Sequence, residues 1–420
     1  MPAVRPNPAA MELALDDSLS GRRRPVRRRD GASVRLYVCG PTVYAPGHVG
    51  HGRTYLYFDV VRRFLEAEGV PVRHVMNFTD VEDKIDRRAA ELGISTTALT
   101  RREERGFLRD LSALDVRLPQ ERPRASEYVP AMVAIGRALE RTGRVRRTGE
   151  EWTYSPPPRR ERENFLSGDE LARHAVPEAG HPFPVTGGRE FQLWKRQSPP
   201  LPSWPSPWGP GVPGWHLECF AMAERLLGVP VDLHGGGRDL VYPHHFAENE
   251  VALELEGRRF SDLYLHTAFV LQDGAKMSKS AGNLVLLRDG LRRWGPGALR
   301  WYLLGDRPRA RLEWSDRAAD RARAELDDLR AGVRHWVGPG TGGRGRAAAA
   351  RRLAATVRTE LAGGLRTDRA IAALRGFSEE LGRAPAGRLA RGERRAAIAA
   401  LRDVEERTGI RLLADARANA

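Results

Sequence analysis

The stretch VRLYVCGPTVYAPGHVGHGRTYLYFDVVRRFLEAE, residues 34–68, decides the fold. Residues 34–38 have the composition of a strand, and the glycine and proline that follow Cys39 indicate a turn. From His51 to Glu68 apolar residues recur at helical spacing. A strand, a glycine-containing loop and a helix in this order predict an α/β nucleotide-binding unit.

The same alternation of strand and helix continues along the chain. After the helix, Thr79-Asp80 can cap a further helix that begins near Val81. The other expected elements are strands at 72–76, 231–233 and 263–265 and a helix over 245–256. We therefore predict an α/β protein with a Rossmann-like, doubly wound parallel sheet as its catalytic domain.

Composition and periodicity divide the chain into six segments. They are a basic N-terminal arm (1–33), the first half of the catalytic domain (34–120), a connective insertion (121–190), the second half (191–285), a connecting segment (286–315) and a C-terminal α-helical bundle (316–420). The arm is rich in proline and arginine, so we expect it to be solvated and partly disordered, with contact to RNA as the alternative.

Charge, hydropathy and cysteine content limit the classes of protein to which this chain can belong. With 69 basic and 54 acidic residues the net charge is +15, which attracts polyanions such as RNA or nucleotide phosphates. No run approaches the ~18 apolar residues that a membrane helix needs, and no secretory signal precedes the first strand. The two cysteines, Cys39 and Cys219, do not form the framework of a disulfide-rich protein. We expect a cytoplasmic protein.

Two short motifs suggest binding of a nucleotide. His48-Val49-Gly50-His51 lies where the first loop enters its helix, and Lys276-Met277-Ser278-Lys279-Ser280 follows a strand-like stretch about 200 residues later. The chain has only four lysines, so two of them three positions apart indicate a task that needs a flexible ammonium group. Imidazoles and ammonium groups together can stabilise the charge that develops when a carboxylate attacks an α-phosphate. The expected reaction is adenylation.

A second set of residues has the chemistry of a metal site. Two thiolates, Cys39 and Cys219, with one imidazole and one carboxylate would complete a tetrahedral zinc site. His244 and Glu248 are four positions apart and would share one face of a helix. Glu250 is the alternative carboxylate, and spacing alone does not establish that three separate segments meet.

The two motifs together resemble the signature pair of class I aminoacyl-tRNA synthetases. Several other stretches narrow the resemblance to the cysteinyl-tRNA synthetase family: YVCGPTVY (37–44), NFTDVEDK (77–84), WPSPWG (204–209), GWHLEC (214–219) and HGGGRD (234–239). The similarity covers roughly residues 34–315. Members of this family form an aminoacyl-adenylate at the switch point of a Rossmann-like sheet.

The resemblance implies a role for each candidate residue. Zinc held by Cys39, Cys219, His244 and Glu248 would bind the substrate's thiolate directly, and a metal that accepts sulfur selects cysteine over serine. The remaining roles are ATP binding by His48, Gly50, His51 and Lys279, catalysis by His48, His51, Lys276 and Lys279, and substrate contacts by Thr42, Thr54, Thr79, Trp215, His234 and Asp239.

Two acceptors fit such a site. The first reading is a cysteine–tRNA ligase with L-cysteine, ATP with Mg²⁺, and tRNA(Cys) as partners; PTVY at 41–44, Arg53, Lys84 and His234 favour it. The alternative is a cysteine ligase that acylates a small amine such as the glucosaminyl inositol of mycothiol biosynthesis. Residues 282–285 and the short chain after Ser280, where we expect no anticodon-binding module, favour the alternative.

Overall fold

The computed structural model describes residues 11–158, 190–198, 201–277, 284–337, 346–383 and 391–413 of the 420-residue chain. Its centre is a parallel sheet of four strands in the order β10-β9-β3-β4. The strands are β3 (Val34–Val38), β4 (Val72–Met76), β9 (Leu233–Gly237) and β10 (Tyr264–Thr267). The first two strands coincide with the expected ones, and the last two begin one or two residues later than expected.

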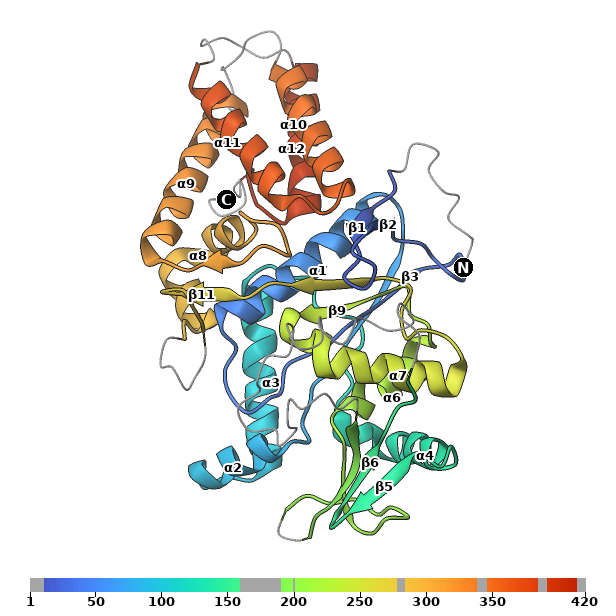
Figure 1. The fold of residues 1–420 in the computed structure, drawn as a ribbon. Helices are drawn as coiled ribbons and strands as arrows, with labels where there is room; N and C mark the ends of the chain where they lie inside the picture. The colour runs from blue at the N-terminus through green and yellow to red at the C-terminus, as the bar shows by residue number, and fades with distance from the viewer. Residues whose placement is uncertain are drawn as a thin grey trace.

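The connections of this sheet produce a switch point. Strand β3 continues through α1 (Val49–Ala67) to β4 on one side, whereas β9 continues through α7 (Phe246–Glu256) to β10 on the other. The chain therefore diverges between β3 and β9, and a ligand cleft is expected outside the carboxyl ends of these two strands. Figure 1 shows α1 on one side of the sheet, with α7 and α6 (His216–Leu227) on the other.

The alternation of side chains in β3 explains the two cores. Leu36 and Val38 point to the α1 side and join the larger apolar cluster. Tyr37, between them, points to the other side and packs with residues of α6 and α7. Both faces of the strand are buried, as expected for a central strand of a parallel sheet.

The insertion has a sheet of its own. Its strands are β5 (Val145–Thr148), β6 (Glu151–Tyr154), β7 (Phe191–Arg196) and β8 (Gly211–Pro213), antiparallel in sequence order. The expected boundary at residue 190 is too early, because β6 pairs with β7 across it. Helix α4 (Val129–Glu140), which follows the short helix η1 (Ala125–Tyr128), packs against β8. Helices α2 (Asp83–Leu92) and α3 (Thr96–Ala113) pair with each other, and α3 contacts α8.

The described part of the N-terminal arm is folded, so the expectation of a solvated arm is wrong for residues 11–33. Strands β1 (Ala14–Asp16) and β2 (Arg23–Pro25) form a hairpin. Leu13 and Leu15 are buried in the larger core. The buried carboxylate of Asp17 accepts a hydrogen bond from the backbone N–H of Tyr264 in β10 at 3.0 Å. Burial of the two leucines and the hydrogen bond to Asp17 together attach this basic segment to the sheet.

A bundle of helices completes the molecule, as expected, and lies above α1 in Figure 1. It consists of α9 (Asp316–Val337), α10 (Arg346–Ala362), α11 (Thr367–Arg383) and α12 (Arg391–Thr408). The sheet leads to it through β11 (Val270–Gln272), β12 (Ala275–Lys276), α8 (Leu287–Leu303) and β13 (Leu312–Glu313). Among the described helices, none combines the length and the apolar character that crossing a membrane requires.

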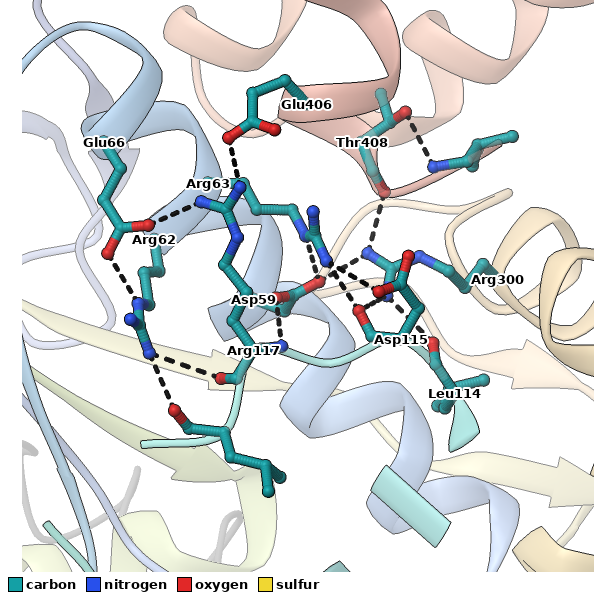
Figure 2. Close-up of polar contacts among 12 residues, drawn as sticks. Asp59, Arg62, Arg63, Glu66, Leu114, Asp115, Arg117, Arg300, Glu406 and Thr408 are labelled. Carbon is teal, nitrogen blue, oxygen red and sulfur yellow. Dashed lines mark hydrogen bonds and ion pairs between the residues drawn. The ribbon is translucent and has the colours of Figure 1, made fainter. Parts of the chain in front are cut away.

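A buried ionic network joins α1, α8 and the end of α12 (Figure 2). Arg300 of α8 pairs with Asp59 of α1, and both side chains are almost fully buried. The same guanidinium donates to the backbone carbonyl oxygens of Leu114 at 3.1 Å and Thr408 at 2.8 Å. Burial raises the pKa of Asp59, but Arg300 and Arg63 outweigh it and lower that pKa overall. The bundle is therefore bonded to the helix that carries the first motif.

Candidate active site

A cavity of about 330 Å³ lies outside the carboxyl ends of β3, β9 and β10, beside the first motif. This is the switch point of the sheet, where α/β proteins bind their ligands. Eleven of the candidate residues line it: Cys39, Thr42, His48, Gly50, His51, Thr54, Thr79, Trp215, Cys219, Asp239 and His244. Residues from four segments far apart in the sequence thus share one cavity.

The four candidate metal ligands meet at one side of this cavity. The Sγ atoms of Cys39 and Cys219 are 3.5 Å apart, which is far longer than the ~2.05 Å of a disulfide. The Nε2 atom of His244 lies 3.4 Å from the Cys219 Sγ atom and 3.0 Å from the Glu248 Oε1 atom. All four donor atoms lie within 4.8 Å of one another, and all four residues are buried.

The polypeptide brings these ligands together in a simple way. Cys39 directly follows β3, Cys219 lies in the first turn of α6, and His244 lies in η3 (Val241–His245), one turn before Glu248 of α7. The spacing of four therefore selects Glu248 as the carboxylate. Glu250 is also buried but does not belong to the cluster.

The side chains of the cluster influence one another's protonation. Burial raises the pKa of Cys219, but the hydrogen bond with Cys39 and the charge of His244 lower it to about 6. Burial likewise raises the pKa of Glu248, and His244, His234 and His245 outweigh it and hold that pKa well below the usual range. Burial lowers the pKa of His244, but the charges of Glu248 and Cys219 outweigh it and hold that pKa well above its usual value, so the imidazolium supplies the positive charge between them. Two sulfur donors, one imidazole and one carboxylate are a donor set that fits zinc.

Three more histidines surround the cluster, and only His234 was expected there. The His234 Nε2 atom lies 2.9 Å from the Glu248 Oε2 atom, and its Nδ1 atom lies 3.0 Å from the Tyr37 carbonyl oxygen. His245 contacts the Cys39 Sγ atom at 3.3 Å through Nε2 and the His266 Nε2 atom at 2.7 Å through Nδ1. Such contacts hold ligands in place. The position of His245 next to His244 could have indicated that His245 lies near the cluster. Nothing in the sequence around His266 indicated that this residue lies there.

The first motif forms the N-terminus of α1. The His48 Nδ1 atom accepts a hydrogen bond from the backbone N–H of Gly50 at 3.1 Å, and the His51 Nδ1 atom accepts one from the N–H of His48 at 3.3 Å. The two rings stack with centroids 3.9 Å apart. A Cβ atom at Gly50 would lie 2.8 Å from the His48 ring, so the glycine permits this cap. The cap aims the positive end of the helix dipole at the cavity, where phosphate groups are favoured.

The other candidate residues lie on the cavity wall. The Trp215 ring stacks on the His244 ring with centroids 4.3 Å apart. The Thr79 hydroxyl donates to the buried Glu218 carboxylate at 2.9 Å. The hydroxyls of Thr54 and Thr267 are 2.7 Å apart. The wall is thus partly polar and held by hydrogen bonds of its own.

The second motif is only partly described. Lys276 belongs to β12, and only its backbone is described, whereas Lys279 lies outside the described residues. The chain after the motif lies against the first motif, since the N–H of Val49 donates to the carbonyl of Val285 at 3.0 Å. Lys84, which was not among the expected site residues, lines the cavity too.

Comparison with known proteins agrees with this geometry. Residues 25–324 match the family model described as tRNA synthetases class I (C) catalytic domain. A cysteine–tRNA ligase of Thermococcus onnurineus (strain NA1) is 39% identical over 324 residues, which are 76% of this chain and 67% of that protein. One from Anaeromyxobacter sp. (strain K) is 40% identical over 329 residues, 76% of this chain and 68% of that protein. The chain spans about two thirds of the length of these relatives.

Solved structures show the same fold. The Mycobacterium tuberculosis methionyl-tRNA synthetase bound by methionyl-adenylate aligns over 90% of each chain with a TM-score of 0.60 and 18% identity. The leucyl enzyme of Agrobacterium radiobacter K84 aligns over 90% of this chain and 84% of its own, with a TM-score of 0.62 and 11% identity. The expected Rossmann-like fold and the expected family are confirmed: the chain belongs to the class I tRNA synthetases, in the group whose curated members are cysteine–tRNA ligases.

Proposed function

We propose that this protein is a cysteine–tRNA ligase, which activates L-cysteine with ATP and transfers it to tRNA(Cys). The observation that carries the proposal is the meeting of Cys39, Cys219, His244 and Glu248 in the cavity that His48 and His51 also line. A sulfur-binding site and a phosphate-binding site in one cavity suit a reaction between a thiol amino acid and a nucleotide. Free thiols at both cysteines agree with a cytoplasmic protein.

The four ligands would hold Zn²⁺, which when bound supplies a Lewis-acidic position that prefers a thiolate to a hydroxyl. Around it the protein positions the amino acid. Trp215 walls the pocket and is fixed by stacking on His244. Thr79 and Asp239 present polar groups to the aminoacyl moiety, and His234 holds Glu248 at 2.9 Å. Serine would lack the sulfur, so selection needs no second editing site.

The nucleotide would bind across the N-terminus of α1 as its complex with Mg²⁺. His48, Gly50 and His51 face the phosphate and adenine groups, and Thr42 and Thr54 line the phosphate side. Lys276 and Lys279 would neutralise the triphosphate as the cysteine carboxylate attacks the α-phosphate and pyrophosphate leaves. The ribose hydroxyl at the 3′ end of tRNA then attacks the cysteinyl carbonyl, and AMP leaves.

The first test is cysteine-dependent exchange of pyrophosphate into ATP by the zinc-loaded protein. We expect exchange with L-cysteine and a rate at least about 100-fold lower with L-serine or L-alanine. Comparable exchange with alanine would refute the assignment of the pocket to a thiol. The matched variant Lys279→Arg keeps the charge but not its placement, and should lower exchange while leaving cysteine binding nearly unchanged.

The second test identifies the acceptor. Protein, ATP and labelled cysteine are incubated with total tRNA in one reaction and with glucosaminyl inositol in another. We expect label on tRNA that is released by mild base, as an ester should be. Label on the amine alone would establish the alternative, a small-amine cysteine ligase, because both functions share the same adenylating site.

A further inference from the structure

Glu218 is a buried carboxylate that has no part in the proposed adenylation. It lies in the first turn of α6, next to the candidate zinc ligand Cys219, and its side chain is fully buried. Its Oε2 atom accepts a hydrogen bond from the hydroxyl of Thr79 at 2.9 Å. Within the part of the chain that the structure describes, its Oε1 atom has no hydrogen-bond partner. Because a buried oxygen without a partner costs free energy, folding alone does not account for this acid.

A neighbouring acid shows the more usual arrangement. Asp80 directly follows Thr79 in the chain. Its Oδ1 atom accepts from the backbone N–H of Ser126 at 2.8 Å, and its Oδ2 atom accepts from the Ser126 hydroxyl at 2.6 Å. The described residues therefore provide partners for both oxygens of Asp80, but for only one oxygen of Glu218.

The hydroxyl of Thr79 connects Glu218 with the cavity. Thr79 lines the cavity, and its backbone is fixed by the segment after β3: its N–H donates to the Pro41 carbonyl at 3.2 Å, and its carbonyl accepts from the Val43 N–H at 3.1 Å. The hydroxyl oxygen accepts from the Asn77 Nδ2 atom at 3.3 Å while its proton goes to Glu218. A hydroxyl has one proton and two lone pairs, so Thr79 can bind a ligand only as an acceptor.

The same hydrogen bonds lead to the candidate metal ligands. The Asn77 Oδ1 atom accepts from the backbone N–H of Gly40 at 2.8 Å and lies 3.5 Å from the Cys219 Sγ atom. This contact with Gly40 leaves the Nδ2 atom as the donor to Thr79. The acceptor at Thr79 therefore has a fixed position relative to the sulfur-binding side of the cavity.

A metal that accepts a thiolate does not by itself select an amino acid. It would also accept 3-mercaptopropionate, which is cysteine without its amino group. Selection against such thiols requires contacts with the group that they lack. An acceptor hydroxyl backed by a carboxylate favours a positively charged donor, because hydrogen bonds between ionised groups are the stronger ones and the charges attract.

We propose that Glu218 is the positioning residue through which Thr79 recognises the α-ammonium group of the substrate, so that the site rejects thiols without this group. The inference rests on the proposed binding of cysteine and deepens it. The ammonium donates to the Thr79 hydroxyl, and the Glu218 carboxylate stabilises its charge. Glu218 does not line the cavity, whereas Thr79 does, so Glu218 acts on the ligand through Thr79.

The experiment measures binding of L-cysteine and of 3-mercaptopropionate to zinc-loaded, full-length protein by calorimetry, without ATP. The variant Glu218→Gln keeps the size of the side chain but removes its charge. We expect the Kd for L-cysteine to rise about tenfold or more. The Kd for 3-mercaptopropionate should stay the same or fall. The control Glu224→Gln changes an exposed acid of the same helix, and should leave both constants within about twofold of wild type.

The ratio of the two constants separates positioning from a structural role. A distorted site or a lost metal ion would weaken both ligands, whereas loss of ammonium recognition weakens cysteine alone. A double-mutant cycle tests the route through Thr79. If Glu218 acts through that hydroxyl, Thr79→Val/Glu218→Gln should bind cysteine within about twofold of Thr79→Val alone. Additive losses would contradict the route.

Two results would overturn the inference: wild-type protein that binds both thiols equally, or wild-type constants in Glu218→Gln. Neither result touches the proposed function, provided that the wild type still shows cysteine-dependent pyrophosphate exchange. A wild type that neither binds cysteine nor exchanges pyrophosphate would refute the proposed function, and the inference with it.

Discussion

The guanidinium of Arg300 in α8 is bonded at once to the carboxylate of Asp59 in α1 and to the carbonyl of Thr408 at the end of α12. Helix α8 begins three residues after the described chain resumes beyond the second motif, and α1 begins within the first motif. One buried residue therefore ties together the helices next to both motifs and the C-terminal segment. Arg300 thus belongs to the scaffold that sets the geometry of the site.

Loss of this arginine should be costly. In Arg300→Met the Asp59 carboxylate stays buried with only part of its hydrogen bonds, and we expect the free energy of unfolding to fall by about 3–5 kcal/mol. The matched control Arg73→Met breaks the pair with Glu121, whose side chains are 47% and 30% exposed, and should cost below about 1 kcal/mol. Urea denaturation followed by circular dichroism measures both. Equal losses of unfolding free energy in Arg300→Met and Arg73→Met would contradict the importance assigned to the buried pair of Arg300 and Asp59.

Gly409 should tolerate no side chain. Its φ is +68°, and a Cβ atom there would lie 2.2 Å from the Arg300 Nη2 atom. Because the network holds that guanidinium in place, the clash is not easily relieved, and Gly409→Ala should destabilise the fold by about 1–3 kcal/mol. Gly376→Ala in α11 is the control, since its Cβ meets nothing within 4 Å and alanine favours a helix by about 0.5–1 kcal/mol. Thermal unfolding should move the two variants in opposite directions.

Metal content should distinguish the two neighbouring glutamates. We expect the wild type to retain about one zinc ion per chain after dialysis against a weak chelator. Glu248→Gln removes a donor from the cluster, so this variant should lose most of its zinc. Glu250→Gln, a change of the same size two residues away in α7, should keep its zinc. Elemental analysis by mass spectrometry gives the ratio directly. If Glu248→Gln kept the full zinc content of the wild type, another residue would have to be the fourth zinc ligand.

His74 should make stability depend on pH. Burial, followed by the charge of Arg62, lowers the pKa of its imidazole to about 3 in the folded protein, with Asp59 opposing the shift. Below the unfolded pKa of about 6.5 the unfolded chain therefore binds a proton that the folded chain does not, and stability is lost as pH falls towards 3.

At pH ~5 this loss amounts to about 2 kcal/mol for one histidine. His74→Leu should remove that part of the slope of unfolding free energy between pH ~7.5 and ~5. The control His335→Leu changes an exposed histidine of α9 and should keep the wild-type slope. An unchanged slope in His74→Leu would show that other groups carry the dependence.

The sequence predicted the elements that have strong local signals. The strand at 34–38 is apolar throughout its buried positions, and the helix after the first motif has a clear apolar face, so both were located within two residues. The metal cluster was predictable as a set of residue types, but its closure depends on where α6 and η3 lie relative to β3. Only the tertiary structure brings those segments together.

The errors have physical causes too. The arginine-rich composition of residues 1–33 suggested a solvated segment, although Leu13 and Leu15 are buried and help to attach the N-terminal hairpin to the core. The short strands of the insertion are marked by few residues each, so their sheet and its end at Pro213 escaped detection. His266 reaches the cluster through its contact with His245, which no spacing rule describes. Long-range contacts of this kind leave no periodic trace in a sequence.

The docking of the bundle on α1 has a consequence for how this protein can be divided. One continuous apolar cluster runs from Leu36 in the sheet to Leu401 in α12, and Glu68 at the end of α1 is clasped by Arg358 and Arg407. The family match ends at residue 324, in the middle of α9. A fragment cut there would expose apolar surface and remove both arginine partners of the Glu68 carboxylate. The end of the family match is therefore not the end of a unit that folds by itself, and the two parts should be expressed and engineered as one piece.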